Sequence, residues 1–148
     1  MNSSEKFEFE VVVIGAGIVG LAIAYELSKE YNKILVIEKE NTFGQHVSSR
    51  NSEVIHSGFY YPNNSLKAKL CVKGNKMIYE FCENYNIKYN RCGKLVVANN
   101  ENEINELSKI LNVAQGNNVE GIEIIDYLQA RKIESKVKCE KALWVPST

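Results

Sequence analysis

The chain has 148 residues, of which 45% are hydrophobic, and its 18 basic and 18 acidic side chains give a formal net charge of zero. This length provides for one sizeable core, so we expect one domain or part of a larger one, and the balanced charge argues against an extended nucleic-acid surface. No stretch approaches the ~18 apolar residues that a transmembrane helix needs. The segment Met1–Lys6 has neither the apolar core of a secretory signal nor the arginines of a transit peptide.

The cysteine pattern indicates a reduced protein. The four cysteines form no C-x-x-C pair and have no neighbouring histidines, which argues against a metal site. We therefore expect a cytoplasmic protein without disulfides, in which Cys82 lies on the apolar face of a helix. The four cysteines are Cys71, Cys82, Cys92 and Cys139.

A glycine-rich motif follows a short apolar run near the start of the chain. Val11–Ile14 is a run of four β-branched residues, which predicts a strand buried on both faces of a parallel sheet. The glycines after it form the pattern G-x-G-x-x-G. In such a pattern Gly15 permits a tight turn, Gly17 lets a pyrophosphate approach the backbone, and Gly20 lets the next helix pack against the sheet.

The residues after the glycines complete a nucleotide-binding pattern. We expect a helix from Ile18 to about Lys29, whose N-terminal N–H groups point at the phosphates, and a second buried strand over Ile34–Ile37. Glu38 ends this strand 18 residues after the last glycine. A carboxylate at that position typically accepts hydrogen bonds from an adenosine ribose and repels a 2′-phosphate. Together these features predict dinucleotide binding.

A polar run after the nucleotide unit has two interpretations. Ser48 and Ser49 are good N-cap residues, so a second helix could begin here and place Arg50 near a phosphate or flavin. The alternative is a surface loop with capping serines.

The only histidines are His46 and His56. His56 lies in the β-prone run Glu53–Pro62, beside a glycine and close to two tyrosines. An imidazole is suited to accept a proton near neutral pH, so His56 is a candidate for the active site. The alternative is a structural histidine.

The rest of the chain alternates between helical and strand patterns. The helix expected over Leu66–Tyr85 has an apolar stripe that we interpret as core packing. Asp126 and Gln129 are spaced as a capping box that opens a helix to about Val137. The apolar stripe comprises Leu70, Met77, Ile78, Phe81, Cys82 and Tyr85. The other expected elements are two strands within 86–98, a helix over 101–114, and strands over 122–125 and 142–145.

Several stretches resemble a known family. The run Val11–Ala22 is similar to the opening of the D-amino-acid-oxidase-like flavoproteins. More narrowly, Arg50–Tyr61, Ser65–Gly74 and Cys92–Ala98 resemble hallmarks of the L-2-hydroxyglutarate dehydrogenases and oxidases. The resemblance extends from about Val11 to Thr148.

The resemblance implies FAD as the cofactor. In this family the glycines of the G-x-G-x-x-G motif and the acid corresponding to Glu38 would hold the phosphates and the ribose of FAD. The polar run Ser48–Ser52 would lie near the pyrophosphate and the flavin ring. The implied cofactor-binding residues are Gly15, Gly17, Gly20, Glu38, Lys39, Ser48, Ser49, Arg50, Asn51 and Ser52.

The resemblance also implies a reaction. It is the oxidation of an L-2-hydroxy acid, most specifically L-2-hydroxyglutarate to 2-oxoglutarate, by hydride transfer to the flavin, which carries the redox chemistry. His56 would be the base or a substrate contact, and Tyr60 and Tyr61 would line the pocket. A quinone or oxygen would accept the electrons.

The predicted fold class is α/β, with a Rossmann-like FAD/NAD(P)-binding βαβ unit followed by part of a mixed α/β substrate domain. The expected division is an FAD-binding unit over 1–62, a connecting helix over 63–85 and an incomplete substrate-domain segment over 86–148. One βαβ unit supplies too few parallel strands for a doubly wound sheet. We therefore expect the front part of a longer protein. The resemblance implies that family members continue beyond this segment and that the arginine or lysine that clamps the substrate carboxylates lies in that later part.

Other hypotheses remain at this stage. A flavoprotein of the same class could act on glycerol phosphate or an amino acid, and a truncated module could bind nucleotide without catalysis. An NAD-dependent dehydrogenase is disfavoured, because the run Arg50–Tyr61 has no role in that fold. Peripheral membrane contact is an alternative to a purely cytoplasmic location, and the oligomeric state stays open.

Overall fold

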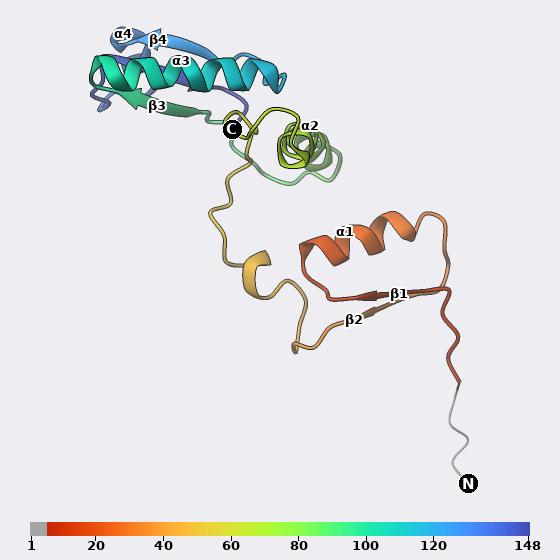
Figure 1. Cartoon of the computed structure of the whole chain (residues 1–148). Helices are drawn as coiled ribbons and strands as arrows, with labels where there is room; N and C mark the ends of the chain where they lie inside the picture. The colour runs from red at the N-terminus through yellow and green to blue at the C-terminus, as the bar shows by residue number, and fades with distance from the viewer. Residues whose placement is uncertain (1–5) are drawn as a thin grey trace. The chain divides into compact units, whose positions relative to one another are not determined.

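The computed structural model describes residues 6–148, which form two compact units (Figure 1). The first unit ends at Glu53 and the second spans Val54–Thr148. Each unit has a sheet of its own, with two strands in the first and three in the second. The three-part division expected from the sequence stays a prediction.

The first unit is the βαβ unit that the sequence predicts. Strand β1 (Val11–Ile14) pairs in parallel with β2 (Ile34–Ile37), and helix α1 (Ile18–Leu27) connects them. The register runs from Val11 opposite Ile34 to Ile14 opposite Ile37. A single turn of 3₁₀ helix, η1 (His46–Ser48), follows β2. The predicted order of strand, helix and strand is therefore confirmed.

The sequence predicts that β1 is buried on both faces, and this prediction is wrong. Val13 is buried, but Val12 is exposed and the side chain of Ile14 is 85% exposed. The physical reason lies in the sheet, in which β1 pairs with β2 alone among the described residues. A strand in a two-stranded sheet with a helix packed on it has one face covered, and its alternate side chains face outward.

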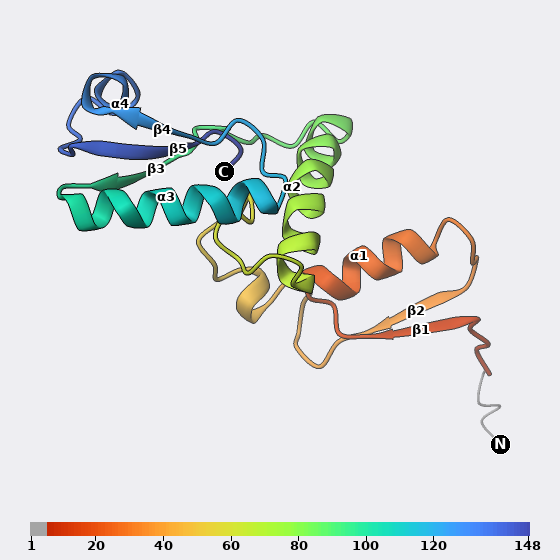
Figure 2. The ribbon, with the colours of Figure 1, turned by 45° about the horizontal axis from the view of Figure 1, so that its top comes forward.

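The second unit contains an antiparallel sheet with helices on both faces. Its strands are β3 (Lys94–Ala98), β4 (Glu123–Asp126) and β5 (Lys141–Val145), in the spatial order β3-β5-β4. The last strand is thus the central one. Figure 2 shows α3 (Glu101–Gly116) along one face of the sheet and α4 (Tyr127–Ile133) on the other.

Alternation along β5 builds a core on each face of this sheet. Leu143 and Val145 are fully buried in a cluster with Leu107 and Ala114 of α3. Ala142 points the other way and packs in a second cluster with Ile125 of β4 and Ala130 of α4. Successive side chains of a strand point to opposite faces, so the central strand supplies both cores.

Side-chain caps define where the helices of the second unit begin. Ser65 Oγ accepts from the Ala68 N–H at 3.1 Å and caps α2 (Leu66–Asn84), and Asn100 caps α3 in the same way. The predicted capping box is confirmed at α4, where Asp126 and Gln129 exchange hydrogen bonds of 2.8 and 3.0 Å. Each cap satisfies N–H groups that have no partner within the helix.

The buried face of α2 differs from the predicted apolar stripe. Leu70 is 59% exposed and Met77 is 55% exposed, whereas Asn75 and Tyr79 are buried. Hydrogen bonds explain which face of α2 is buried. The side chains of Asn75 and Tyr79 donate to the carbonyl of Ser147, which follows β5, and so the helix face that carries them is turned toward the sheet. Cys82 is buried as expected.

Three further local expectations are wrong. The run Glu53–Pro62 and the segment 86–93 contain no strand, and α4 ends at Ile133 instead of continuing to Val137. Left-handed backbone at Glu53, Gly58 and Asn86 interrupts the first two segments. Such residues cannot continue the extended pairing of a strand.

Candidate functional site

The glycine turn after β1 has a geometry that its residue types dictate. Gly15 has a φ of +99°, which favours glycine. A Cβ added at Gly20 would lie 1.9 Å from the carbonyl oxygen of Gly15, so the helix approaches the turn as closely as it does because residue 20 has no side chain. The backbone geometry thus agrees with the tight turn predicted at Gly15 and with the close helix packing predicted at Gly20.

The carboxylate of Glu38 joins the end of β2 to this turn. Its Oε2 accepts from the Ala16 N–H at 2.6 Å, and its Oε1 accepts from the Glu40 N–H at 3.0 Å. These backbone donors, with Glu40 contributing most and Ala16 next, hold the pKa of the Glu38 carboxyl below its ordinary value of 4.5. Each carboxylate oxygen can accept more than one hydrogen bond, so both oxygens retain capacity for ribose hydroxyls.

Ser48 caps helix α1 from a distance in sequence. Gly17 provides no side-chain cap, and the Ser48 hydroxyl accepts the Ile18 N–H at 2.9 Å. A Cβ at Gly17 would lie 3.1 Å from the Ser48 Oγ. The predicted site residues Gly17 and Ser48 are therefore brought together at the N-terminus of α1.

The other residues of the polar run lie outside this contact. No helix begins at Ser48 or Ser49, because the only helical turn here is η1, which ends at Ser48. Asn51 Nδ2 donates to the carbonyls of Val47 and Ser48, and Ser49 Oγ donates to the carbonyl of His46, so this segment is a loop held by side-chain hydrogen bonds. Arg50, Ser49 and Ser52 are exposed, and so is Lys39, whose Nζ lies 3.5 Å from Glu40 Oε1.

Sequence reasoning missed Glu40 and His46. His46 Nε2 lies 2.9 Å from Glu40 Oε1, and this contact lowers the pKa of the Glu40 carboxyl. The loop that they close is also held by the Gly44 N–H, which donates to the Ala16 carbonyl at 2.8 Å. Neither residue belongs to a recognisable motif, and His46 has a left-handed backbone that its residue type does not predict.

These residues fit the phosphate and ribose of a dinucleotide. No heavy atom lies within 4 Å of a Cβ built at Gly15, so the turn leaves open space beside the N-terminus of α1. The partial positive charge of a helix N-terminus favours phosphate. An acid whose pKa is lowered stays ionised and accepts hydroxyl donors at the end of β2.

The candidate catalytic residues lie in the second unit. The His56 ring is exposed, and its backbone carbonyl accepts from Asn75 Nδ2 at 3.2 Å. Tyr60 packs against Tyr61 with ring centroids 5.0 Å apart, and Lys67 Nζ lies 4.4 Å from the Tyr61 ring centroid. Burial, with a smaller contribution from Tyr60, raises the pKa of Tyr61. The backbone of His56 is thus anchored to α2 while its imidazole is accessible.

The cysteines are free thiols, and burial raises the pKa of Cys71 and Cys139. Within residues 6–148 there is no group of three or more side chains suited to hold a metal ion. Over the same range no helix combines the length and apolar character needed to cross a membrane.

Comparison with known proteins identifies relatives over nearly the whole chain. The family model described as FAD dependent oxidoreductase matches residues 10–148. The mitochondrial L-2-hydroxyglutarate dehydrogenase of Arabidopsis thaliana is 43% identical and aligns with 97% of this chain and 30% of its own length. The Homo sapiens protein of the same name is 39% identical over 99% of this chain and 32% of its own length. This chain therefore spans about a third of the length of these relatives.

Solved structures agree with the predicted fold class. L-α-glycerophosphate oxidase from Mycoplasma pneumoniae, solved with FAD bound, has a TM-score of 0.77 and 29% identity over 95% of this chain and 38% of that chain. L-proline dehydrogenase from P. horikoshii has a TM-score of 0.76 over 95% of this chain and 37% of that chain, and its 22% identity shows likeness of fold alone. The α/β class with a Rossmann-like nucleotide unit is confirmed.

The cytoplasmic location expected from the sequence is wrong. The finding that overturns it is the description of the relatives, since the proteins from Arabidopsis thaliana, Caenorhabditis briggsae and Homo sapiens are all named mitochondrial. The expectation rested partly on cysteine usage, which does not separate two reducing compartments. It rested also on the composition of the first residues, and the description of the relatives overrules that indication.

Replacing Gly20 by alanine should strongly destabilise the first unit. The new methyl group would lie 1.9 Å from the Gly15 carbonyl oxygen, and we expect a loss of roughly 3 kcal/mol or more in the free energy of unfolding of that unit. Urea denaturation followed by NMR signals of residues 6–53 measures the change. Gly74→Ala is the matched control, because a Cβ there meets nothing within 4 Å in the interior of α2. The control should be stabilised by about 0.5–1 kcal/mol, and equal effects of the two changes would contradict the packing role.

The ionised Glu38 should stabilise the first unit above about pH 4.5 and lose this effect as the pH falls through its lowered folded-state pKa. The sign follows because the folded state binds a proton at Glu38 less readily than the unfolded chain does. Carbon-13 NMR of the Glu38 carboxyl group should give a titration midpoint below 4.5. Glu38→Gln should make the stability of the first unit less dependent on pH in this acid range, and a wild-type midpoint at or above 4.5 would refute the assignment.

Proposed function

Because the chain belongs to the family of FAD-dependent oxidoreductases, we propose that its first unit binds the ADP part of FAD. The open turn at Gly15 and the N-terminus of α1 hold the pyrophosphate, and Glu38 accepts the ribose hydroxyls. The observation that carries this proposal is the Glu38 carboxylate, fixed by the Ala16 and Glu40 N–H groups at the end of β2. Ser48 supports the helix end through its bond to the Ile18 N–H.

The remaining residues of the predicted cofactor set have different roles in this proposal. Lys39 supplies an exposed positive charge next to Glu38, and Ser49 and Asn51 hold the loop that carries Ser48 through their bonds to the η1 backbone. Arg50 and Ser52 are accessible for contacts with the cofactor. Their exposure leaves both side chains available for binding.

We further propose that the protein to which this chain corresponds oxidises an L-2-hydroxy acid, namely L-2-hydroxyglutarate, to the 2-oxo acid. The supporting observation is identity of 39–43% with proteins named L-2-hydroxyglutarate dehydrogenase over nearly all of this chain. Bound FAD supplies the acceptor for the hydride from C2 of the substrate. The protein must remove the hydroxyl proton and orient the substrate, and a quinone or oxygen then takes the electrons.

His56 is the proposed base for the hydroxyl proton. Its ring is exposed, and two hydrogen bonds to its carbonyl, from Cys71 Sγ at 3.3 Å and from Asn75 Nδ2, hold the backbone in place. An anchored backbone with an accessible imidazole suits a group that must reach a substrate hydroxyl. Tyr60 and Tyr61 provide an aromatic wall in the same unit and are the proposed lining of the pocket.

One alternative substrate has specific support. The FAD-bound L-α-glycerophosphate oxidase is 29% identical to this chain at a TM-score of 0.77. A glycerol phosphate would present a hydroxyl for oxidation next to a phosphate in place of a carboxylate. The two substrates are distinguished by which one reduces the bound flavin.

Visible absorption of the purified chain tests cofactor and substrate together. We expect a flavin spectrum after incubation with FAD, and bleaching when L-2-hydroxyglutarate is added without oxygen. Glycerol 3-phosphate and the D-enantiomer of the acid serve as controls and should leave the flavin oxidised. A protein that takes up no FAD would contradict the binding proposal, while bound flavin that stays oxidised with the L-acid would contradict the reaction for this chain.

His56→Gln should slow the anaerobic bleaching by about 10²–10⁴-fold, the usual effect of removing a general base. The glutamine keeps a polar side chain but cannot accept the proton. FAD uptake by the variant, measured by absorbance at saturation, controls for folding and should equal that of the parent chain. Bleaching at the parent rate would exclude His56 as the base.

A further inference from the structure

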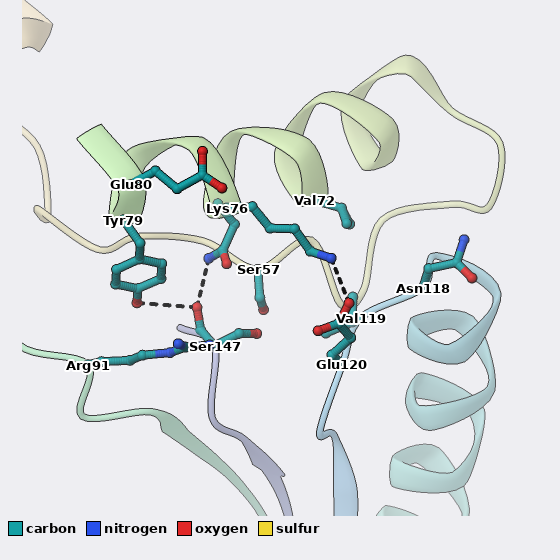
Figure 3. A pocket seen from close by; sticks show the side chains of 11 residues that line it. Ser57, Val72, Lys76, Tyr79, Glu80, Arg91, Asn118, Val119, Glu120 and Ser147 are labelled. Carbon is teal, nitrogen blue, oxygen red and sulfur yellow. Dashed lines mark hydrogen bonds and ion pairs between the residues drawn. The ribbon is translucent and has the colours of Figure 1, made fainter. Parts of the chain in front are cut away.

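The second unit contains a small pocket between α2, the turn after α3 and the end of β5 (Figure 3). Its volume is about 270 Å³, which is near the lower end for small-molecule sites. Val72, Val119 and the ring of Tyr79 provide apolar wall, and the polar lining includes Arg91 and Ser147. All of these residues belong to the second unit.

Ser147 presents an unused polar atom in this pocket. The residue is 8% exposed, and within the described residues its Oγ has no hydrogen-bond partner. The carbonyl of the same residue is held firmly, because Asn75 Nδ2 donates to it at 2.7 Å and the Tyr79 hydroxyl at 3.4 Å. A buried polar group without a partner is unfavourable, so a hydrogen bond from a ligand to the Ser147 hydroxyl would be favourable.

Arg91 provides the positive charge that remains available. Its guanidinium lies 4.8 Å from the centroid of the Tyr79 ring, and Figure 3 shows its side chain extending toward Ser147. Among residues 6–148 no carboxylate forms an ion pair with Arg91, whereas Lys76 is paired with Glu120 at 2.6 Å across the pocket. Stacking on Tyr79 orients the guanidinium plane and leaves its N–H groups free to donate.

We propose that this pocket binds the carboxylate group of a small organic acid, with the Arg91 guanidinium and the Ser147 hydroxyl as its donors. The planar fork of arginine matches the two oxygens of a carboxylate. The apolar surfaces of Val72 and Val119 accommodate a short aliphatic chain. The Lys76–Glu120 pair closes the far side and joins α2 to the segment before β4.

Charge favours a carboxylate over a phosphate here. The pocket is lined by two basic residues, Arg91 and Lys76, and two acidic residues, Glu80 and Glu120. Lys76 is paired with Glu120, whose carboxyl also interacts with Arg91, and Glu80 adds a nearby negative charge, so the lining is formally neutral. One carboxylate group of a small acid brings a single charge into the pocket, whereas a phosphate group brings close to two, so the carboxylate group suits this balance better.

NMR of the 148-residue chain tests the proposal without any flavin. Glutarate is the probe, because it carries carboxylates but has no 2-hydroxyl to oxidise, and sodium phosphate at equal ionic strength is the comparison. We expect saturable shifts of the Arg91 side-chain signal and of the amides of Tyr79 and Ser147 with glutarate. Absence of saturation with glutarate, or saturation with phosphate in its place, would overturn the carboxylate site.

Variants separate a built site from general charge attraction. Arg91→Gln should weaken glutarate binding about 10-fold or more, and Ser147→Ala should weaken it while leaving the fold stable, because it removes an unsatisfied hydroxyl. Arg131→Gln is the matched control, since Arg131 also lies over a tyrosine ring, at 5.6 Å from Tyr127, but does not line the pocket. Equal effects of the two arginine changes would overturn the proposal, and this result would not depend on whether the chain binds FAD.

Discussion

The first unit depends on the close approach of α1 to the turn after β1. Only a hydrogen at the Gly20 Cα allows that helix to begin against the Gly15 carbonyl. From this approach follow the direction of the helix axis and the position of its N-terminal N–H groups. The Glu38 carboxylate then joins the turn to the end of β2 through the Ala16 N–H. The geometry that fits a nucleotide is therefore a consequence of backbone packing.

The second unit depends on its last strand. Strand β5 pairs with both β3 and β4, and its alternate side chains supply the buried residues of both faces. The residues that follow it also orient α2, because Ser147 accepts hydrogen bonds from two side chains of that helix. The same contacts that orient α2 leave the Ser147 hydroxyl buried without a partner. A structural requirement and a candidate binding site thus arise from one residue.

The family and the chemistry proposed for the chain rest on different kinds of observation. Family membership follows from a match over residues 10–148, whereas the proposed substrate rests on the names of relatives that are about three times as long. The nucleotide turn is built within one short unit, so its chemistry can be argued from this chain. His56 is different, because a general base is defined by the substrate hydroxyl that it reaches.

The sequence alone determined the elements that depend on local interactions. The bounds of β1 and β2, the start of α1, the place of Glu38 and the capping box at Asp126 agree with the structure, since each depends on neighbours within a few turns or on one βαβ unit. Tertiary contacts decided the rest. Ser48 caps a helix that begins 30 residues earlier, Asn75 and Tyr79 select the buried face of α2, and β5 inserts between two earlier strands. Periodicity gives the apolar positions of a helix, but the partner that arrives from elsewhere in the chain determines which of its faces is buried.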